Sequence, residues 1–387
     1  MQIYMYMFFF SALLLYLSEK VHERRIKKVC AVLGLLLPCV LGGIRHYTIG
    51  TDVNVYLRPL FQNATISTSF IEYISSHWWY IWSYKHVANF EYGFNVLVYL
   101  VAKSTGNIQI LMFLIQTLII LPIYFALKKY KELQGKIWFA MLTFYLLLYN
   151  NSFNVMRQYI GISFVFYGTS CLLIEKKELN FIISLIIAYF FHKSSLIGIL
   201  IFFIYKIFKK KRDGKTIKVK MGENEISLKS LLIVVAFIAG LLIMGNLKQI
   251  TLLLENIGLS KYAGYISGEV YFKGTNFIKI LPVVILFFIN RKSFFEKSNN
   301  SYIYIIFFCI DFLSSYLSSV NIYAARIGYI FQTFNIITFT HIVFATENKK
   351  KRKFNKLYML AYLSYYWYFT YMHGGVGQTI PFKPYWK

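Results

Sequence analysis

The chain is poor in acidic residues, cysteine and proline. It has 16 Asp and Glu against 42 Lys and Arg in 387 residues, with 4 cysteines and 6 prolines. The cysteines lie in apolar segments without paired spacing, so the sequence supports neither a disulfide framework nor a zinc site. We expect them to act as small buried hydrophobic side chains.

The signatures of several enzyme classes are also missing. There is no G-x-x-x-x-G-K-[ST] phosphate loop, no Asp-x-Asp pair for a metal and nucleotide sugar, no His-Glu-x-x-His motif and no Gly-x-Ser-x-Gly elbow. The 7 histidines are scattered along the chain. We therefore expect neither a metal nor a cofactor, and any reaction should use a substrate that is already activated.

Apolar residues dominate instead. Hydrophobic residues make up 57% of the chain, aromatic residues 20% and charged residues only 15%, and several apolar runs approach the length that crosses a bilayer. The sequence predicts an all-α, polytopic integral membrane protein formed by a single domain, residues 1–387. The net charge of +26 would suggest a nucleic-acid partner in a soluble protein, but here it is concentrated in short loops between apolar runs. We expect no nucleic-acid partner.

The basic loops predict which helix ends face the cytoplasm. Most Lys and Arg residues fall in alternate loops, including 19–28, 128–136, 209–229 and 349–356, which the positive-inside rule places on the inner side. The pattern predicts about twelve transmembrane helices, in a range of about 10 to 13, with both chain ends outside. Residues 1–18 form an uncleaved first span in this interpretation.

Three segments lie between or beyond the predicted spans. Residues 43–106 form an outer loop with an interfacial helix at Trp78, Trp79, Tyr80 and Trp82, followed by an interfacial or re-entrant segment at 92–102. Residues 209–229 form a basic, flexible cytoplasmic loop, and 373–387 form an outer tail.

Polar residues from distant parts of the chain meet the outer membrane boundary in this topology. Charge at such positions is costly, so it usually has a partner or a function. Arginine binds two anionic oxygens through its planar guanidinium group, so three arginines at one depth would suit a diphosphate. Each arginine alone would equally suit contact with lipid headgroups. The residues are Arg45, Asp52, Arg157, Gln158, His192 and Arg326.

Three ionisable residues allow more than one interpretation. Asp52 follows Gly50 in a turn, where it would cap the turn, act as a base or orient an arginine. His192 ends an apolar run. It would act as a base for a sugar hydroxyl, or it would be a helix-end residue whose ring hydrogen-bonds to water. Asp311 lies within an apolar run, where an acid normally pairs or faces a cavity, and Arg326 is one hypothetical partner.

An ordered set of motifs resembles a known family. The set is R-H-Y-T-I-G-T-D followed by Tyr56, N-V-M-R-Q-Y-I-G, F-F-H-K-S-S-L, Arg326 with Tyr329, and P-F-K-P-Y, and it covers nearly the whole chain. It resembles the EpsG family of exopolysaccharide polymerases, which is similar in role to the Wzy polymerases of O-antigen and capsule pathways. One departure is Gly161, where the family pattern leads us to expect alanine.

The resemblance implies a metal- and nucleotide-independent glycosyltransferase in the bacterial cytoplasmic (inner) membrane. At its outer face, an undecaprenyl-diphosphate-linked glycan would be transferred onto another lipid-linked repeat. Further partners would be membrane lipid, a flippase and a chain-length regulator. The roles implied are diphosphate binding by Arg45, Arg157 and Arg326, deprotonation of the acceptor hydroxyl by His192 or Asp52, and support by Gln158, Tyr56 and Tyr329.

Other functions of an envelope pathway remain open at this point. A flippase for lipid-linked oligosaccharide would need a charged path that changes sides, whereas these arginines stay on one side. An O-antigen ligase or an acyltransferase would attach or cap chains without lengthening them. A scaffold without enzymatic activity would tolerate loss of all three arginines.

Overall fold

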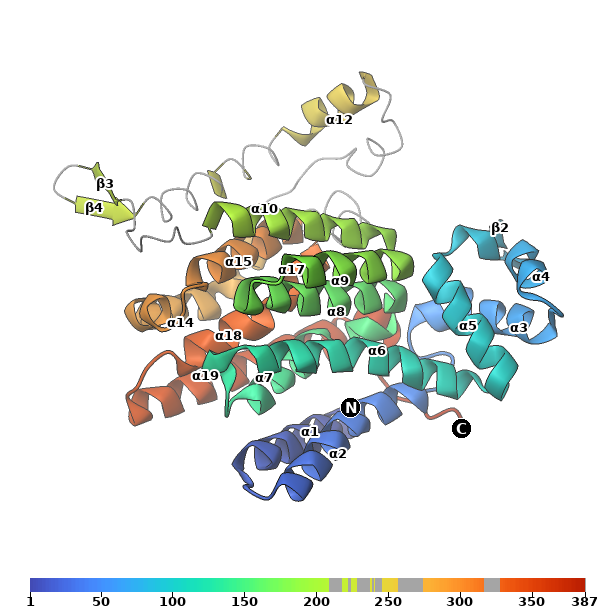
Figure 1. Cartoon of the computed structure of the whole chain (residues 1–387), viewed down its shortest axis with the longest axis horizontal. Coiled ribbons are helices and arrows are strands. Elements are labelled where there is room, and N and C mark those ends of the chain that lie inside the picture. The colour runs from blue at the N-terminus through green and yellow to red at the C-terminus, as the bar shows by residue number, and fades with distance from the viewer. Residues whose placement is uncertain are drawn as a thin grey trace. The chain divides into compact units, whose positions relative to one another are not determined.

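The protein is built almost entirely from helices (Figure 1), as the sequence predicts. The computed structural model describes residues 1–208, 218–221, 224–227, 237–238, 240, 246–256, 274–316 and 328–386. Within these ranges, strands occur only in two short hairpins. The chain forms two compact units, one of Met1–Leu196 with Leu360–Lys387 and one of Ile197–Met359.

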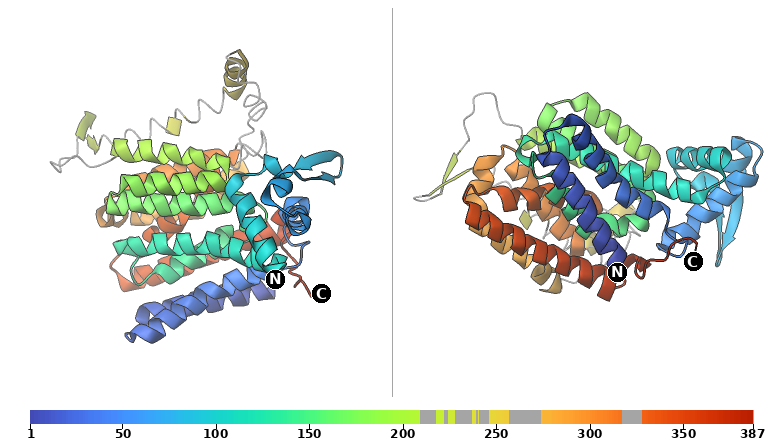
Figure 2. Two further views of the ribbon diagram at one scale, coloured as in Figure 1. Left: turned by 45° about the vertical axis from the view of Figure 1, so that its right-hand side comes forward. Right: turned by 90° about the horizontal axis from the view of Figure 1, so that it is seen from below.

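Long helices that pack side by side make up most of the first unit (Figures 1 and 2). Helix α1 packs on α2 and α7, α2 on α6, α6 on α8, and α8 on α9. Close packing depends on small residues, since a Cβ at Gly34 of α2 would lie 3.2 Å from the Ser11 carbonyl oxygen of α1. The bounds are α1 Gln2–Lys20, α2 Arg24–Gly43, α6 Ile108–Lys129, α7 Ile137–Phe144, α8 Met156–Ser170 and α9 Glu178–Phe191.

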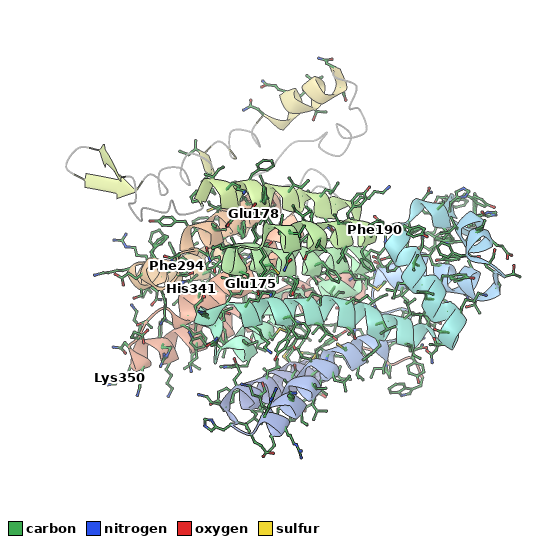
Figure 3. All side chains as sticks on the ribbon, in the orientation of Figure 1. Glu175, Glu178, Phe190, Phe294, His341 and Lys350 are labelled. Atoms are coloured by element: carbon green, nitrogen blue, oxygen red, sulfur yellow. The ribbon has the colours of Figure 1, made fainter. Side chains whose placement is uncertain are left out.

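The two ends of these helices carry different polar contacts. At one end, Lys129 pairs with Glu175 at 2.5 Å. At the other end, Tyr4 near the start of α1 donates a hydrogen bond of 2.8 Å to the Thr379 carbonyl of the C-terminal tail. Figure 3 shows Glu175 and Glu178 at the first of these ends and Phe190 at the opposite end of α9. The chain termini therefore lie at the Phe190 end.

A smaller lobe follows α2 at this same end and contains residues 44–106. Its elements are α3 Arg58–Ile66, α4 Phe70–Ser75, strands β1 His77–Tyr80 and β2 Ser83–His86, and α5 Tyr92–Thr105. The predicted interfacial helix at 78–82 is wrong, because β1 and β2 form an antiparallel hairpin with Ile81 and Trp82 at its turn. Aromatic side chains favour extended backbone when they pack across strands, and Trp79 pairs with Tyr84 in this way.

The second unit contains helices that also pack on one another. Helix α15 contacts α10, α14, α17 and α18. Within this unit Phe294 and His341 lie next to each other (Figure 3), and the His341 Nε2 atom is 2.9 Å from the Phe294 carbonyl oxygen. The bounds are α10 Ile199–Phe208, β3 Lys218–Met221, β4 Asn224–Ser227, α12 Leu247–Asn256, α14 Gly274–Lys297, α15 Ser301–Tyr316, α17 Gly328–Thr333, α18 Asn335–Phe344 and α19 Lys349–Trp367, the last ending in the first unit.

Two described helices, α2 and α6, are long and apolar enough to cross a membrane. Shorter apolar helices cover Ile137–Tyr149, Glu178–Phe191 and Ser301–Tyr316. The number of about twelve spans therefore stays a prediction. Of the predicted basic loop 209–229, only β3 and β4 are described, and Arg326 lies outside the described residues.

Candidate functional site

Arg157 occupies the first turn of α8, directly after the Asn-rich break at 150–154. Its Nη1 atom forms an ion pair with Glu91 Oε2. The guanidinium carbon lies 4.9 Å from the centre of the Tyr56 ring and 4.7 Å from that of Phe90. Cation–π contacts and the ion pair together hold the guanidinium group in one orientation.

Glu91 links Arg157 to the turn that contains His192. While Oε2 pairs with Arg157, Oε1 accepts a hydrogen bond of 3.3 Å from the Lys193 backbone N–H. Only 10% of the Glu91 side chain is exposed, so its charge is largely withdrawn from water. Glu91 was not among the site residues predicted from the sequence. The scarcity of acidic residues in the predicted outer loop was a signal that could have identified it.

His192 follows the last residue of α9, and its ring is held by Ser194. The Nδ1 atom lies 2.7 Å from Ser194 Oγ and accepts a hydrogen bond of 3.3 Å from the Ser194 backbone N–H. A ring nitrogen that accepts from an N–H carries no proton, so the neutral imidazole has its proton on Nε2. In this geometry the Nε2 atom of neutral His192 carries the proton and can act as a hydrogen-bond donor.

Asp52 and Tyr56 form a hydrogen-bonded pair beside Arg157. The Tyr56 hydroxyl donates to Asp52 Oδ2 at 2.8 Å. Burial, together with the negative charge of Asp52, raises the pKa of Tyr56 well above its usual value, so this phenol stays protonated at neutral pH. The chain reaches this position through a tight bend at Gly50, where φ is 85° and a Cβ would lie 2.6 Å from the Phe153 carbonyl oxygen.

Arg45 lies beneath this cluster and is fully buried. Its Nη1 atom donates to the Gly42 carbonyl at 2.7 Å, Nη2 lies 3.1 Å from Met156 Sδ, and the guanidinium carbon is 4.3 Å from the centre of the Phe153 ring. Burial lowers the pKa of Arg45 to about 10, so the group keeps its positive charge at neutral pH. A diphosphate would touch Arg45 only after the covering residues moved.

The C-terminal tail covers the backbone on both sides of Arg45. The His46 N–H donates to the Lys383 carbonyl at 2.8 Å, and the Tyr385 N–H donates to the Ile44 carbonyl at 2.9 Å. Two of the motifs that carry the family resemblance, R-H-Y-T-I-G-T-D and P-F-K-P-Y, are therefore neighbours in the folded chain.

The remaining predicted residues have different surroundings. Gln158 is buried next to Arg157 in α8, whereas Tyr329 belongs to α17 of the second unit. Asp311 Oδ2 accepts a hydrogen bond of 2.7 Å from Asn335, and its hypothetical partner Arg326 lies outside the described residues. The structure thus brings Asp52, Tyr56, Arg157 and the His192 turn together in the first unit.

Gly161 allows α8 to pack closely on the segment after α9. A Cβ at this position would lie 2.2 Å from Ser195 Oγ and 3.1 Å from the Ala188 carbonyl oxygen. These contacts leave no room for the alanine that the family pattern suggests, unless Ser195 moves. Glycine at position 161, in place of the alanine of the family pattern, therefore leaves room for the Ser195 side chain.

A cation, a carboxylate pair, a protonated phenol and an imidazole thus meet at the ends of apolar helices. No group of three or more His, Cys, Asp or Glu residues within the described part of the chain is placed to hold a metal ion. The positive charge of Arg157 and the oxygen atoms of Asp52 and Tyr56 suit an anionic substrate that also carries hydroxyl groups.

The chain belongs to the EpsG family, whose family model matches residues 28–385, nearly the whole sequence. EpsG proteins are Wzy-like polysaccharide polymerases, so the resemblance noted in the sequence is confirmed. Neither a curated protein nor a solved structure shows significant similarity to the chain. Family membership and helical content indicate a membrane protein. The family also indicates a role in exopolysaccharide synthesis, with lipid-linked sugars as the substrates.

Proposed function

We propose that the protein lengthens a polysaccharide at the outer face of the bacterial cytoplasmic membrane, by transferring a glycan from undecaprenyl diphosphate onto another lipid-linked repeat. Membership of the EpsG family supports the class of reaction. The observation that carries the proposal is the cluster in which Arg157, Glu91 and the His192 turn lie beside Asp52 and Tyr56. The donor, the acceptor and the side of the membrane are part of the proposal.

The proposed reaction exchanges one bond at the anomeric carbon for another and transfers one proton. A hydroxyl oxygen of the acceptor sugar attacks the anomeric carbon of the donor glycan, and the bond from that carbon to the lipid diphosphate breaks. The hydroxyl proton passes to a base, and the departing diphosphate keeps the bonding electrons. Positive charge fixed in a site with little water stabilises that anion without reorganisation. We assign contact with the diphosphate to Arg157, while Arg45 contributes its charge from beneath. The role of Arg326 in diphosphate binding, which the family resemblance implies, stays a prediction because this residue lies outside the described part of the chain.

Asp52 is the base that the geometry favours. The Tyr56 hydroxyl orients its carboxylate, and a carboxylate can accept the proton of the acceptor hydroxyl. His192 suits a different role, because its Nδ1 atom accepts from Ser194 and its neutral ring therefore donates from Nε2. We assign His192 to a hydrogen bond with an oxygen atom of the donor or acceptor.

His192→Gln should therefore keep the transfer rate within about threefold of the wild type, whereas His192→Ala, which removes the hydrogen-bond donor, should lose about 10² in rate. The amide nitrogen of glutamine takes a position close to that of imidazole Nε2 and donates a hydrogen bond, but glutamine is no base. Single-turnover transfer from a lipid-linked repeat, measured between pH 6 and pH 9, checks this prediction. Equal loss in both variants would identify His192 as the base.

Deletion and complementation test the proposed function. In a strain that lacks the protein, we expect single lipid-linked repeats at the outer face and no long polymer. The wild type should restore long chains, and Arg157→Ala should not. A ligase would leave full-length chains unattached, a flippase would leave repeats on the inner face, and a scaffold would tolerate Arg157→Ala. Gel analysis of chain length and the labelling of repeats exposed outside the cell separate these outcomes.

A further inference from the structure

One face of the β1–β2 hairpin carries four exposed aromatic rings. His77 and Trp79 lie on β1, and Tyr84 and His86 lie opposite them on β2. The centre of the Tyr84 ring is 4.5 Å from that of His77, 5.6 Å from that of Trp79 and 5.4 Å from that of His86. These four residues, called the ring face below, form a continuous aromatic surface.

The opposite face of the hairpin joins it to the candidate site. Trp78 stacks on Phe90 with ring centres 5.7 Å apart and planes 28° apart. Phe90 in turn lies beneath the Arg157 guanidinium group, at 4.7 Å. The two strands project from the lobe beside α5 (Figure 2). A molecule bound on the ring face would therefore lie next to the candidate site.

The chemistry of the ring face matches that of a sugar. None of its four side chains is a Lys, Arg, Asp or Glu, and the imidazole rings of His77 and His86 are exposed. A pyranose ring has C–H groups that pack on aromatic faces and hydroxyl groups around its edge that exchange hydrogen bonds with imidazole. The Trp79 and Tyr84 rings can pack on the C–H groups of a sugar chain, and the cross-strand pair His77 and His86 beside them can bind its hydroxyl groups.

We propose that the ring face binds a pyranose oligosaccharide, the glycan part of the lipid-linked repeat, and guides it toward Arg157. This inference rests on the proposed function. Insertion into the lipid headgroup region would instead use the hairpin turn, where Ile81 is 64% and Trp82 is 90% exposed. Exposed imidazole nitrogens exchange hydrogen bonds with hydroxyl groups, so His77 and His86 suit a ligand rich in hydroxyl groups better than they suit lipid acyl chains. Glycan binding thus depends on Trp79 and Tyr84, and membrane contact depends on Trp82.

A binding assay without turnover tests the proposal. The probes are oligosaccharides obtained by partial acid hydrolysis of the envelope polysaccharides of the producing cell, titrated against the full chain in nanodiscs. Trp79→Ala and Tyr84→Ala should each weaken binding about tenfold, while Trp79→Phe, which keeps a ring, should lose about threefold or less. Trp82→Ala is the matched control, because it removes an exposed tryptophan from the same hairpin, and it should bind like the wild type.

Three outcomes would overturn the ring face as a glycan site. In the first, the wild type binds none of the probes. In the second, Trp79→Ala and Trp82→Ala weaken probe binding equally. In the third, Trp79→Ala and Trp82→Ala both lose binding to phosphatidylglycerol vesicles that contain no glycan. Arg157→Ala separates this proposal from the proposed function, since it should bind the probes normally while making no long polymer. Normal polymer from Arg157→Ala would contradict the polymerase site but leave the ring face in place.

Discussion

Arg157→Lys should abolish long polymer even though the positive charge remains. The guanidinium group lies against the rings of Tyr56 and Phe90 and pairs with Glu91, which leaves its edge in a fixed direction. A lysine ammonium group is a compact, strongly hydrated charge that neither stacks flat on two rings nor binds two oxygens in one plane. Loss of one fixed donor to a developing anion lowers rates by about 10² to 10³.

The measurements are chain length on gels and the single-turnover rate at equal protein level. Arg58→Lys is the matched control, because Arg58 belongs to the same lobe, is exposed and stacks on Tyr47 at 4.7 Å, yet has no contact with the cluster. This control should make polymer of normal length. Long polymer from Arg157→Lys at the wild-type level would show that charge alone suffices and that our assignment of the planar group is wrong.

Glu91→Gln should have the second largest effect. Glutamine keeps the size of the side chain and one acceptor oxygen, but it removes the charge that compensates Arg157. The Arg157 and Glu91 side chains are only 20% and 10% exposed, so the unpaired cation should lower the free energy of unfolding by about 1 to 3 kcal/mol. The His192 turn should also lose its anchor at the Lys193 N–H, and we expect transfer to slow by about tenfold to a hundredfold.

Thermal unfolding in detergent and single-turnover transfer check both parts of this prediction. Glu72→Gln is the matched control, since Glu72 is an exposed acid in the same lobe whose Oε2 atom accepts from Thr68. It should change neither quantity appreciably. In a double-mutant cycle on the free energy of unfolding, Glu91→Gln should cost much less in the Arg157→Ala background, which has no cation for Glu91 to compensate. Fully additive losses would mean that the two residues act separately.

The apolar periodicity of the sequence identified the helices well. The apolar segments between the predicted charged loops include α6, Ile137–Tyr149 and α9, which are helical because long apolar segments have few alternatives to helix. The aromatic segment 77–86 was assigned wrongly. Its character as a strand depends on cross-strand contacts such as Trp79 with Tyr84, and spacing along one strand does not reveal such contacts.

Individual roles within the site were harder to predict than its members. Arg157 and Asp52 could be selected because charge is rare in apolar surroundings. Three other features depend on the folded structure. The tail encloses Arg45, Glu91 joins two segments, and the His192 Nδ1 atom accepts a hydrogen bond from Ser194. A single sequence does not contain the distances that decide between a ligand-binding arginine and a buried one.

The C-terminal tail also has a consequence for biosynthesis. Thr379 Oγ1 accepts a hydrogen bond of 2.9 Å from Asn150, 229 residues earlier in the chain, and the segment that follows pairs with the backbone around Arg45. Until a ribosome has made these residues and they have reached the same side as α8, the floor of the candidate site is open. A nascent chain whose earlier helices are already folded would therefore still lack the contacts that enclose Arg45.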